Sequence, residues 1–203
     1  MKQIIQVAGI IDNEEAKMLM DLGVEYLGFP LRLPINKEDC SEDEAAEIIK
    51  NITPPHKAVL ITYLDAADEI IAFCNKLNVK IVQLHGHIEL EELIKIKQLR
   101  PDIEVIKSLV VKGNNLPELE DKVKTLSHWV DMFITDTFDP DTGASGATGK
   151  SHDLNPDNVK RAILFTNPAG VDVHTGIENK SGKKDFELTK QFVFECSTAF
   201  SQL

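Results

Sequence analysis

A chain of 203 residues is long enough for one large domain or two small ones, and 42% apolar residues can supply a full buried core. The formal net charge of −11, with no clustered Lys and Arg, argues against a nucleic-acid-binding surface. No apolar stretch is long enough to span a bilayer, and the three separated cysteines form no metal-binding pattern. We therefore expect a cytoplasmic protein with reduced thiols, no membrane or nucleic-acid partner and no metal or cofactor.

Short apolar runs alternate with amphipathic helical patterns along the whole chain. The runs are rich in Val and Ile and apolar on both faces, which is typical of strands buried on two sides. The predicted strands are 3–9, 26–31, 57–62, 80–85, 104–111, 132–137 and 170–176. The predicted helices are 14–23, 41–51, 66–77, 89–100, 116–126, 155–164 and 185–200. Ser41 and Glu44 form a capping-box pattern, and Asn155 with Pro156 is typical of another helix start.

This alternation predicts an α/β fold with a parallel sheet and helices outside it. A repeat of roughly 25 residues suits a (β/α)8 TIM barrel, so we expect one barrel domain over residues 1–203. A doubly wound open sheet is the alternative, although no G-x-G-x-x-G follows the first predicted strand. The pattern contains only seven clear strands, so one strand of the barrel is absent.

Short motifs lie at or just after these predicted strands in a fixed order. They are AGI (8–10), LGF (27–29), VQLHG (82–86), VIKS (105–108), the Asp-Thr pair (136–137), GATGKSHD (146–153), LNPDNV (154–159) and GVDVHTGIE (170–178). In this order and spacing they resemble, nearly end to end, the phosphoribosylanthranilate isomerase family of tryptophan biosynthesis. The resemblance implies a (β/α)8 barrel of an amino-acid biosynthesis enzyme.

The resemblance also implies the reaction, an Amadori rearrangement. An N-linked ribose phosphate opens, its C2 proton shifts and a ketose forms, so we expect an aldose–ketose isomerase with a small phosphorylated substrate. The enzyme is expected to be a monomer or a homodimer. The chemistry needs an acid at the ring oxygen and a base at C2, both at the carboxyl-terminal mouth of the barrel. By resemblance the acid is Asp136, whose alternative role is to cap the following turn.

The base is missing, because the family's catalytic Cys corresponds to Ala8. Loss of a general base costs about 10²–10⁴-fold in rate, and Ala8→Cys should recover about 10² or more of it. Three interpretations stay open at this point. The protein is impaired but still binds a sugar phosphate, it uses another base such as Asp12 or His85, or Ala8 is an introduced change.

The resemblance places several substrate-binding candidates at strand ends. Arg32 falls where the family has an Arg near the substrate's carboxylate, with a solvated Arg as the alternative. His85 is expected to support the floor of the active site. Asp172 would orient ligand groups or make a structural hydrogen bond. Thr175 and Gly176 fall where barrel loops bind phosphate, after the last strands.

The stretch ASGATGKS (144–151) nearly matches the P-loop G-x-x-x-x-G-K-[ST]. A P-loop joins an early strand to a helix, whereas this segment follows the sixth predicted strand and has no evident partner motif for Mg²⁺. We expect a mobile loop over the barrel mouth, in which Gly146 and Lys150 approach an anionic substrate. A surface loop without function is the alternative.

The junction at Asp153–Leu154 lacks a helix and a strand that the family has there. The family's Ala-Gly-Gly-Leu phosphate motif keeps only Leu154, so half of the expected phosphate site is absent. A strand needs a crossover of a dozen or more residues to reach its parallel neighbour. Either a segment of about 25 residues is missing from this sequence, which we favour, or the chain is truly short and the barrel is open, repacked or completed by a neighbouring chain.

Two other functions remain open. A non-catalytic relative that binds sugar phosphates would explain Ala8 together with the missing phosphate motif. Another phosphate-handling barrel enzyme, an aldolase or an epimerase, would need a Schiff-base lysine, and Lys107 is the candidate for an inward-facing lysine.

Overall fold

The chain forms one curled parallel sheet surrounded by helices. The structure is a computed structural model and describes residues 3–34, 38–111, 115–137 and 154–203. Seven strands pair in the order β6-β5-β4-β3-β2-β1-β7, and every pair is parallel. They are β1 (Ile4–Ala8), β2 (Tyr26–Pro30), β3 (Lys57–Thr62), β4 (Ile81–Leu84), β5 (Glu104–Val111), β6 (Met132–Thr137) and β7 (Gly170–Val173). Their positions confirm the strands predicted from the apolar runs.

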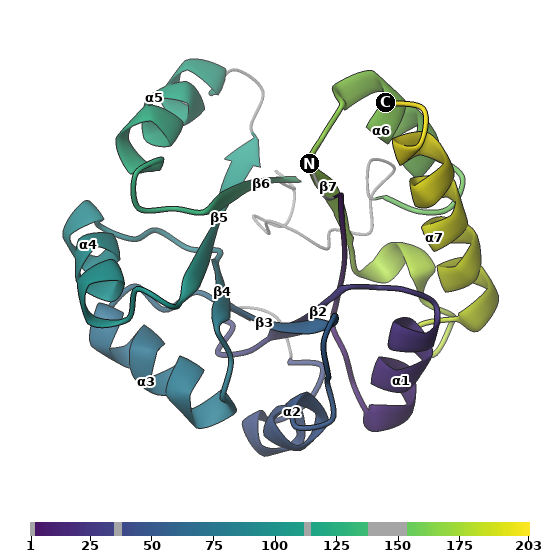
Figure 1. The fold of residues 1–203 in the computed structure, drawn as a ribbon, viewed down its shortest axis with the longest axis horizontal. Coiled ribbons are helices and arrows are strands. Elements are labelled where there is room, and N and C mark those ends of the chain that lie inside the picture. Colours follow the sequence, from purple (N-terminus) through teal and green to yellow (C-terminus); the bar gives the residue numbers. More distant parts are fainter. Residues whose placement is uncertain (1–2, 35–37, 112–114, 138–153) are drawn as a thin grey trace.

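The helices lie outside the ring of strands (Figure 1). They are α1 (Asn13–Asp21), α2 (Glu42–Ile49), α3 (Ala67–Leu77), α4 (Leu90–Leu99), α5 (Leu116–Leu126), α6 (Val159–Thr166), α7 (Phe186–Phe200) and the short η1 (Thr175–Ile177). The capping box of Ser41 and Glu44 is present. The predicted start of α6 is wrong by several residues. Asn155 accepts a hydrogen bond from the backbone N–H of Asp157 and shapes a turn, and the helix begins only at Val159.

Side chains of each strand alternate between two apolar clusters. The larger cluster lies between the sheet and the helices and includes Val7, Leu27 and Val173. The smaller cluster fills the inside of the curl with Ala8, Tyr26, Val59, Ile61, Ile81 and Ile106. This alternation fixes which residues point inward, because successive side chains of a strand face opposite sides.

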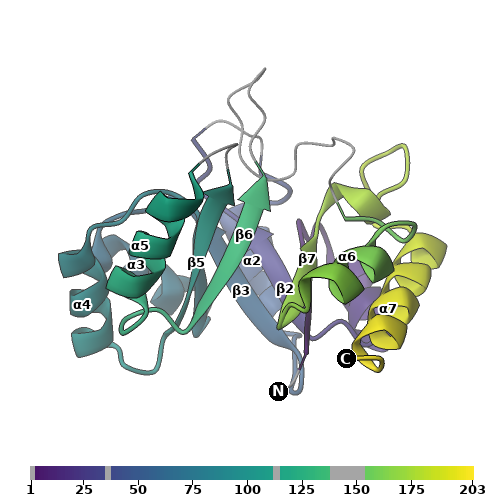
Figure 2. The same ribbon diagram turned by 90° about the horizontal axis from the view of Figure 1, so that it is seen from above.

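The sheet is open between β6 and β7, which are its two end strands. Figure 2 shows these strands on either side of the opening. The fold is therefore a barrel of the (β/α)8 type with one strand missing, as the sequence predicts. Asp153 lies outside the described residues, so the distance across the Asp153–Leu154 junction stays untested.

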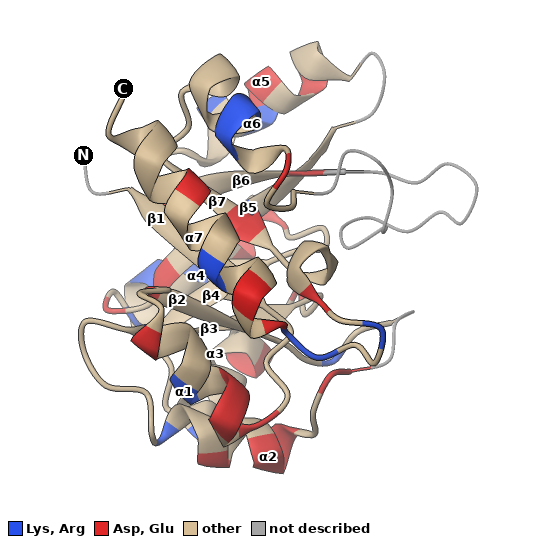
Figure 3. Cartoon of the chain, turned by 90° about the vertical axis from the view of Figure 1, so that its right-hand side faces the viewer, with Lys and Arg blue, Asp and Glu red and all other residues tan. Residues whose placement is uncertain are grey.

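Three further features bear on the sequence predictions. On the side seen in Figure 3, Lys and Arg are interspersed with Asp and Glu and do not form one basic face. The three cysteines are buried and free. Within the described part of the chain, no helix has both the length and the apolar character needed to cross a membrane.

Candidate functional site

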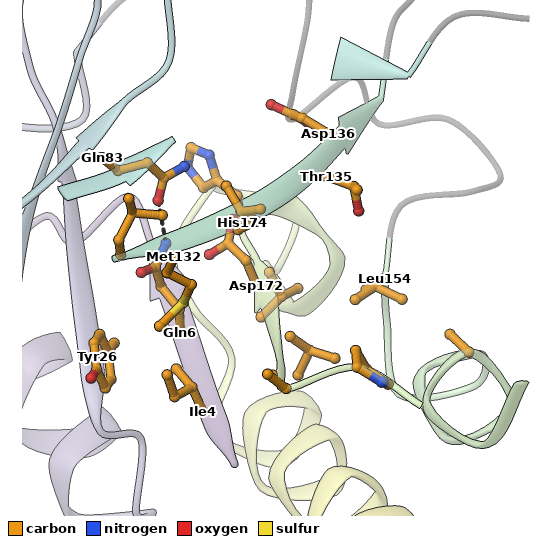
Figure 4. A pocket seen from close by; sticks show the side chains of 18 of the residues that line it. Ile4, Gln6, Tyr26, Gln83, Met132, Thr135, Asp136, Leu154, Asp172 and His174 are labelled. Carbon is orange, nitrogen blue, oxygen red and sulfur yellow. Dashed lines mark hydrogen bonds between the residues drawn. The ribbon is translucent and has the colours of Figure 1, made fainter. Parts of the chain in front are cut away.

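A cavity of about 520 Å³ lies inside the curl of the sheet, beside the opening between β6 and β7. Figure 4 shows Asp136 on β6 and Asp172 on β7 among the side chains around it. Four predicted site residues line this cavity, namely Asp136, Asp172, Thr175 and Gly176. Its other polar lining comes from Gln6, Tyr26, Gln83, Thr135, Thr166 and His174. Asp136, His174, Thr175 and Gly176 lie toward the carboxyl ends of β6 and β7, which meet at one end of the barrel. The cavity also extends to the amino ends of the strands, where it is lined by Ile4, Tyr26, Met132 and Gly170.

Asp136 is held by His85 at this end of the barrel. His85 Nε2 lies 2.5 Å from Asp136 Oδ2, and both side chains are mostly buried. The His85 ring stacks on Tyr63, with ring centroids 4.8 Å apart. The other ring nitrogen, Nδ1, is buried and has no hydrogen-bond partner among the described residues. The stacked imidazole fixes the direction of the Asp136 carboxylate. Asp136 therefore has a side-chain partner, His85, that the alternative role as a turn cap does not require.

Ala8 ends β1 and is 5% exposed. The next residue, Gly9, has φ +79°, a left-handed conformation that glycine adopts without strain. A Cβ added to Gly28 on the neighbouring strand would lie 3.3 Å from the Ala8 Cβ. Two small residues therefore face one another on β1 and β2, and Ala8 itself contributes no group that can exchange a proton.

Asp172 belongs to a polar layer one step deeper in the barrel. Gln6 Nε2 donates to Gln83 Oε1 at 2.7 Å, and Gln83 Nε2 donates to Ser108 Oγ at 3.3 Å. Asp172 is hydrogen-bonded to Gln6, while its Oδ1 is buried without a partner among the described residues. Burial raises the pKa of the Asp172 carboxyl to about 6. The layer forms the polar floor of the cavity.

Asp172→Asn is expected to stabilise the fold at neutral pH. The raised pKa means that the folded state binds more protons than the unfolded state between about pH 4 and 6, so wild-type stability falls as pH rises through this window. The variant should exceed wild type in free energy of unfolding by on the order of 2 kcal/mol at pH 7. Urea denaturation at pH 7 and near pH 3 measures this difference, which should vanish at the lower pH. The exposed Asp157→Asn is the matched control, and an equal difference at both pH values would contradict the assignment.

A charged cluster that the sequence patterns missed surrounds His174. Its Nε2 lies 3.4 Å from Asp39 Oδ1 and 3.6 Å from Glu178 Oε1. Lys184, whose side chain is fully buried, pairs with Glu178 at 2.5 Å. Burial alone would raise the pKa of Asp39, but the hydrogen bond and charge of His174, with the charge of Lys184, lower it. The signal that could have found His174 is strand alternation, which puts residues 172 and 174 on the same inward face.

Thr175 and Gly176 lie in η1, beside the start of the segment that leads to α6. A Cβ on Gly176 would come 1.8 Å from the backbone oxygen of Leu154, so only glycine fits at this contact. Leu154 also lines the cavity. Leu154, the one residue kept from the family's Ala-Gly-Gly-Leu motif, therefore lies next to Thr175 and Gly176, the other residues expected to bind phosphate.

Several other candidates lie elsewhere. The Arg32 guanidinium pairs with Glu42 at 2.8 Å and lies 3.9 Å from the centroid of the Phe73 ring, and it does not line the described cavity. Asp12 caps α1 by accepting from the backbone N–H of Glu15. Gly146 and Lys150 lie outside the described residues.

The expectation that Lys107 faces inward is wrong. Lys107 pairs in register with Leu84, which belongs to the cluster between the sheet and the helices. Its ammonium donates to the backbone oxygens of Leu84 and Ser108 at 3.0 and 2.8 Å. Burial lowers the pKa of Lys107 to about 8, but the amine is not in the barrel cavity, so no Schiff base can form there.

The family model of N-(5′-phosphoribosyl)anthranilate isomerase matches residues 5–154 and 152–195 of this chain. A relative from Methanosarcina mazei, N-(5′-phosphoribosyl)anthranilate isomerase 2, is 31% identical over 97% of this chain and 95% of its own length. The chain belongs to the phosphoribosylanthranilate isomerase family.

Two solved structures of family members superpose on this fold. The enzyme from Thermotoga maritima has a TM-score of 0.80 and 27% identity, covering 97% of this chain and 99% of its own. A second phosphoribosylanthranilate isomerase, solved with reduced 1-(o-carboxyphenylamino)-1-deoxyribulose 5-phosphate, has a TM-score of 0.78, 26% identity and the same coverage of both chains.

The comparisons also locate the missing part of the family fold. The two matched segments of the family model meet at residues 152–154, which is the predicted junction. The alignment with the M. mazei relative spans 217 positions, more than the 203 residues of this chain. That relative therefore carries residues that have no counterpart here.

Proposed function

We propose that this chain isomerises N-(5′-phosphoribosyl)anthranilate to the corresponding ketose by an Amadori rearrangement. The observation that carries the proposal is the carboxylate of Asp136, held 2.5 Å from His85 at the mouth of the cavity in a chain of this family. A relative binds a reduced ketose phosphate of the same class, which supports a ligand of this kind for the cavity. In this proposal, residues 1–203 act as a single domain and need no cofactor, because the reaction only moves protons within one molecule.

The roles follow from where each group lies. Asp136 protonates the ring oxygen, and the contact with His85 aims the carboxyl group. Thr175 and Gly176 face the phosphate, and Asp172 orients the sugar from the floor of the cavity. Gly146 and Lys150 are assigned to the loop above the substrate by resemblance alone. Arg32 has no assigned role with the substrate here, because Glu42 already binds its guanidinium.

KM is proposed to be high, and kcat is proposed to depend on which group replaces the family's Cys. Ala8 cannot take the C2 proton, and a reaction with no general base at all would lose about 10²–10⁴-fold in rate. Only Leu154 remains of the family's Ala-Gly-Gly-Leu phosphate motif. The substrate phosphate therefore has fewer hydrogen-bond donors, and KM should be high.

The test is turnover and binding measured on the same protein. Liquid chromatography should show that more ketose forms from phosphoribosylanthranilate with the enzyme than in a control without it. Isothermal titration should detect the reduced ketose phosphate analogue, while ATP with Mg²⁺ should not bind. Binding without turnover would favour a non-catalytic sugar-phosphate-binding relative, for which Ala8 is the specific argument. Absence of both would refute the proposed function.

A further inference from the structure

His174 is an ionisable group at the cavity that the roles above leave unused. It follows β7 directly, and Val173 pairs with Val7 in register, so His174 lies beside Ala8 on the neighbouring strand. Gln6 and Asp172 pair one step earlier and both line the cavity. Residues two positions further along each strand face the same side, so Ala8 and His174 share the mouth layer.

The imidazole packs directly against the turn that follows Ala8. A Cβ on Gly9 would lie 2.0 Å from His174 Nε2, so the ring occupies the space above this glycine. His174 lines the cavity, and its side chain keeps 22% of its exposure. Asp136 lines the same cavity from β6, on the other side of the opening (Figure 4). An acid and a basic ring therefore face one ligand-sized space from two strands.

The neighbours of His174 suit a group that gains a proton. Asp39 and Glu178 place carboxylate oxygens 3.4 and 3.6 Å from Nε2. Lys184 is bound to Glu178 and offsets part of that charge, which leaves Asp39 as the main anionic partner. Carboxylates beside Nε2 orient the imidazole and stabilise the imidazolium that forms when the ring takes a proton.

We infer that His174 is the general base of this chain and replaces the Cys that Ala8 lacks. The inference rests on the proposed isomerase function. In the step concerned, acid-assisted ring opening has given an open-chain iminium at C1. The C2–H bond breaks, its electron pair forms the C1=C2 double bond, and the electrons of the C=N bond pass to nitrogen. The proton goes to the imidazole, and the enol formed then becomes the ketose.

Other candidate bases are less well placed. Asp172 lies in the layer below, hydrogen-bonded to Gln6, and its second oxygen is buried. Asp12 caps α1 and lies 3.4 Å from the ammonium of Lys183. His85 is already bound to Asp136, the proposed acid.

The experiment is a double-mutant cycle on the full chain, with His174→Gln and Ala8→Cys made singly and together. His174→Gln should lower kcat by about 10² or more, because a general base is lost. Ala8→Cys should raise kcat by about 10² or more in the His174→Gln background and by less than about tenfold in wild type, since only one base is needed. The exposed His87→Gln is the matched control and should keep the wild-type kcat.

Binding measurements separate this inference from the proposed function. Titration with the reduced ketose phosphate analogue should give similar affinities for wild type and His174→Gln, with the same far-ultraviolet circular dichroism. Should His174→Gln not fold, Asp39→Asn is the second variant, and it should lower kcat about tenfold without changing analogue binding.

The following outcomes would show that His174 is not the general base. The inference is overturned if His174→Gln keeps its rate, if Ala8→Cys gives equal gains in both backgrounds, or if the gain is larger in wild type. It is also overturned if Asp172→Asn alone removes turnover, or if wild type binds the analogue without turnover. If wild type neither binds nor turns over, the proposed function itself fails and the inference falls with it.

Discussion

Asp136→Asn is expected to lower kcat by about 10²–10⁴-fold while KM changes little. Asparagine keeps the size of the side chain and a hydrogen-bond partner for His85, but it cannot deliver a proton to the ring oxygen. The loss should therefore fall on the chemical step and not on binding. The measurement is steady-state turnover of phosphoribosylanthranilate together with titration of the reduced ketose phosphate.

Two comparisons sharpen this prediction. Asp65→Asn removes an exposed carboxylate from the loop after β3, at the same end of the sheet, and should leave kcat unchanged. His85→Gln should cost less than Asp136→Asn, because it removes only the group that aims the acid. A variant with Asn at position 136 that retains more than about a tenth of the wild-type kcat would show that Asp136 is not the acid.

Much of the site could be predicted because strand ends carry it. Apolar runs located β1, β6 and β7, and the carboxyl ends of parallel strands must meet at one end of a barrel. The order of residues along the chain is therefore enough to bring Asp136, Ala8 and Asp172 near one another. The direction of Lys107 could not be predicted in this way, because residues 104–111 are apolar on both faces. The structure places the neighbouring Ile106 in the inner cluster, so Lys107 faces the helices.

Side-chain partners that come from irregular segments could not be predicted in this way. Asp39 lies between β2 and α2, where no periodicity fixes the direction of a side chain, yet it contacts His174. Arg32 follows β2 with φ 56°, a left-handed conformation that no strand pattern anticipates. The Arg32 side chain contacts Glu42 and Phe73. Its place in the sequence matches that of the family's Arg, but this match did not determine what the guanidinium binds.

The open edge of the sheet should be the main weakness of this fold. β6 and β7 end the sheet, and their unpaired edges border the cavity. Unpaired strand edges expose backbone hydrogen-bonding groups and favour association with other chains. We expect an insertion between Asp153 and Leu154, taken from the corresponding position of the M. mazei relative, to supply the family's missing helix and strand, because the match to the family model breaks at this junction.

This insertion is expected to raise the melting temperature by roughly 10 °C. An inserted strand would pair the open edges of β6 and β7 and bury apolar side chains in the cavity between them, and we expect a net gain of roughly 3 kcal/mol. Each kcal/mol shifts the melting temperature of a domain of this size by about 2–4 °C. KM should fall as well, since the segment is expected to restore the family's Ala-Gly-Gly-Leu phosphate motif. A Gly-Ser insert of equal length is the matched control, because it lengthens the chain but supplies no strand. Equal melting temperatures for the two insertions would mean that β6 and β7 do not accept an eighth strand between them, and that the open sheet is the complete fold of this chain.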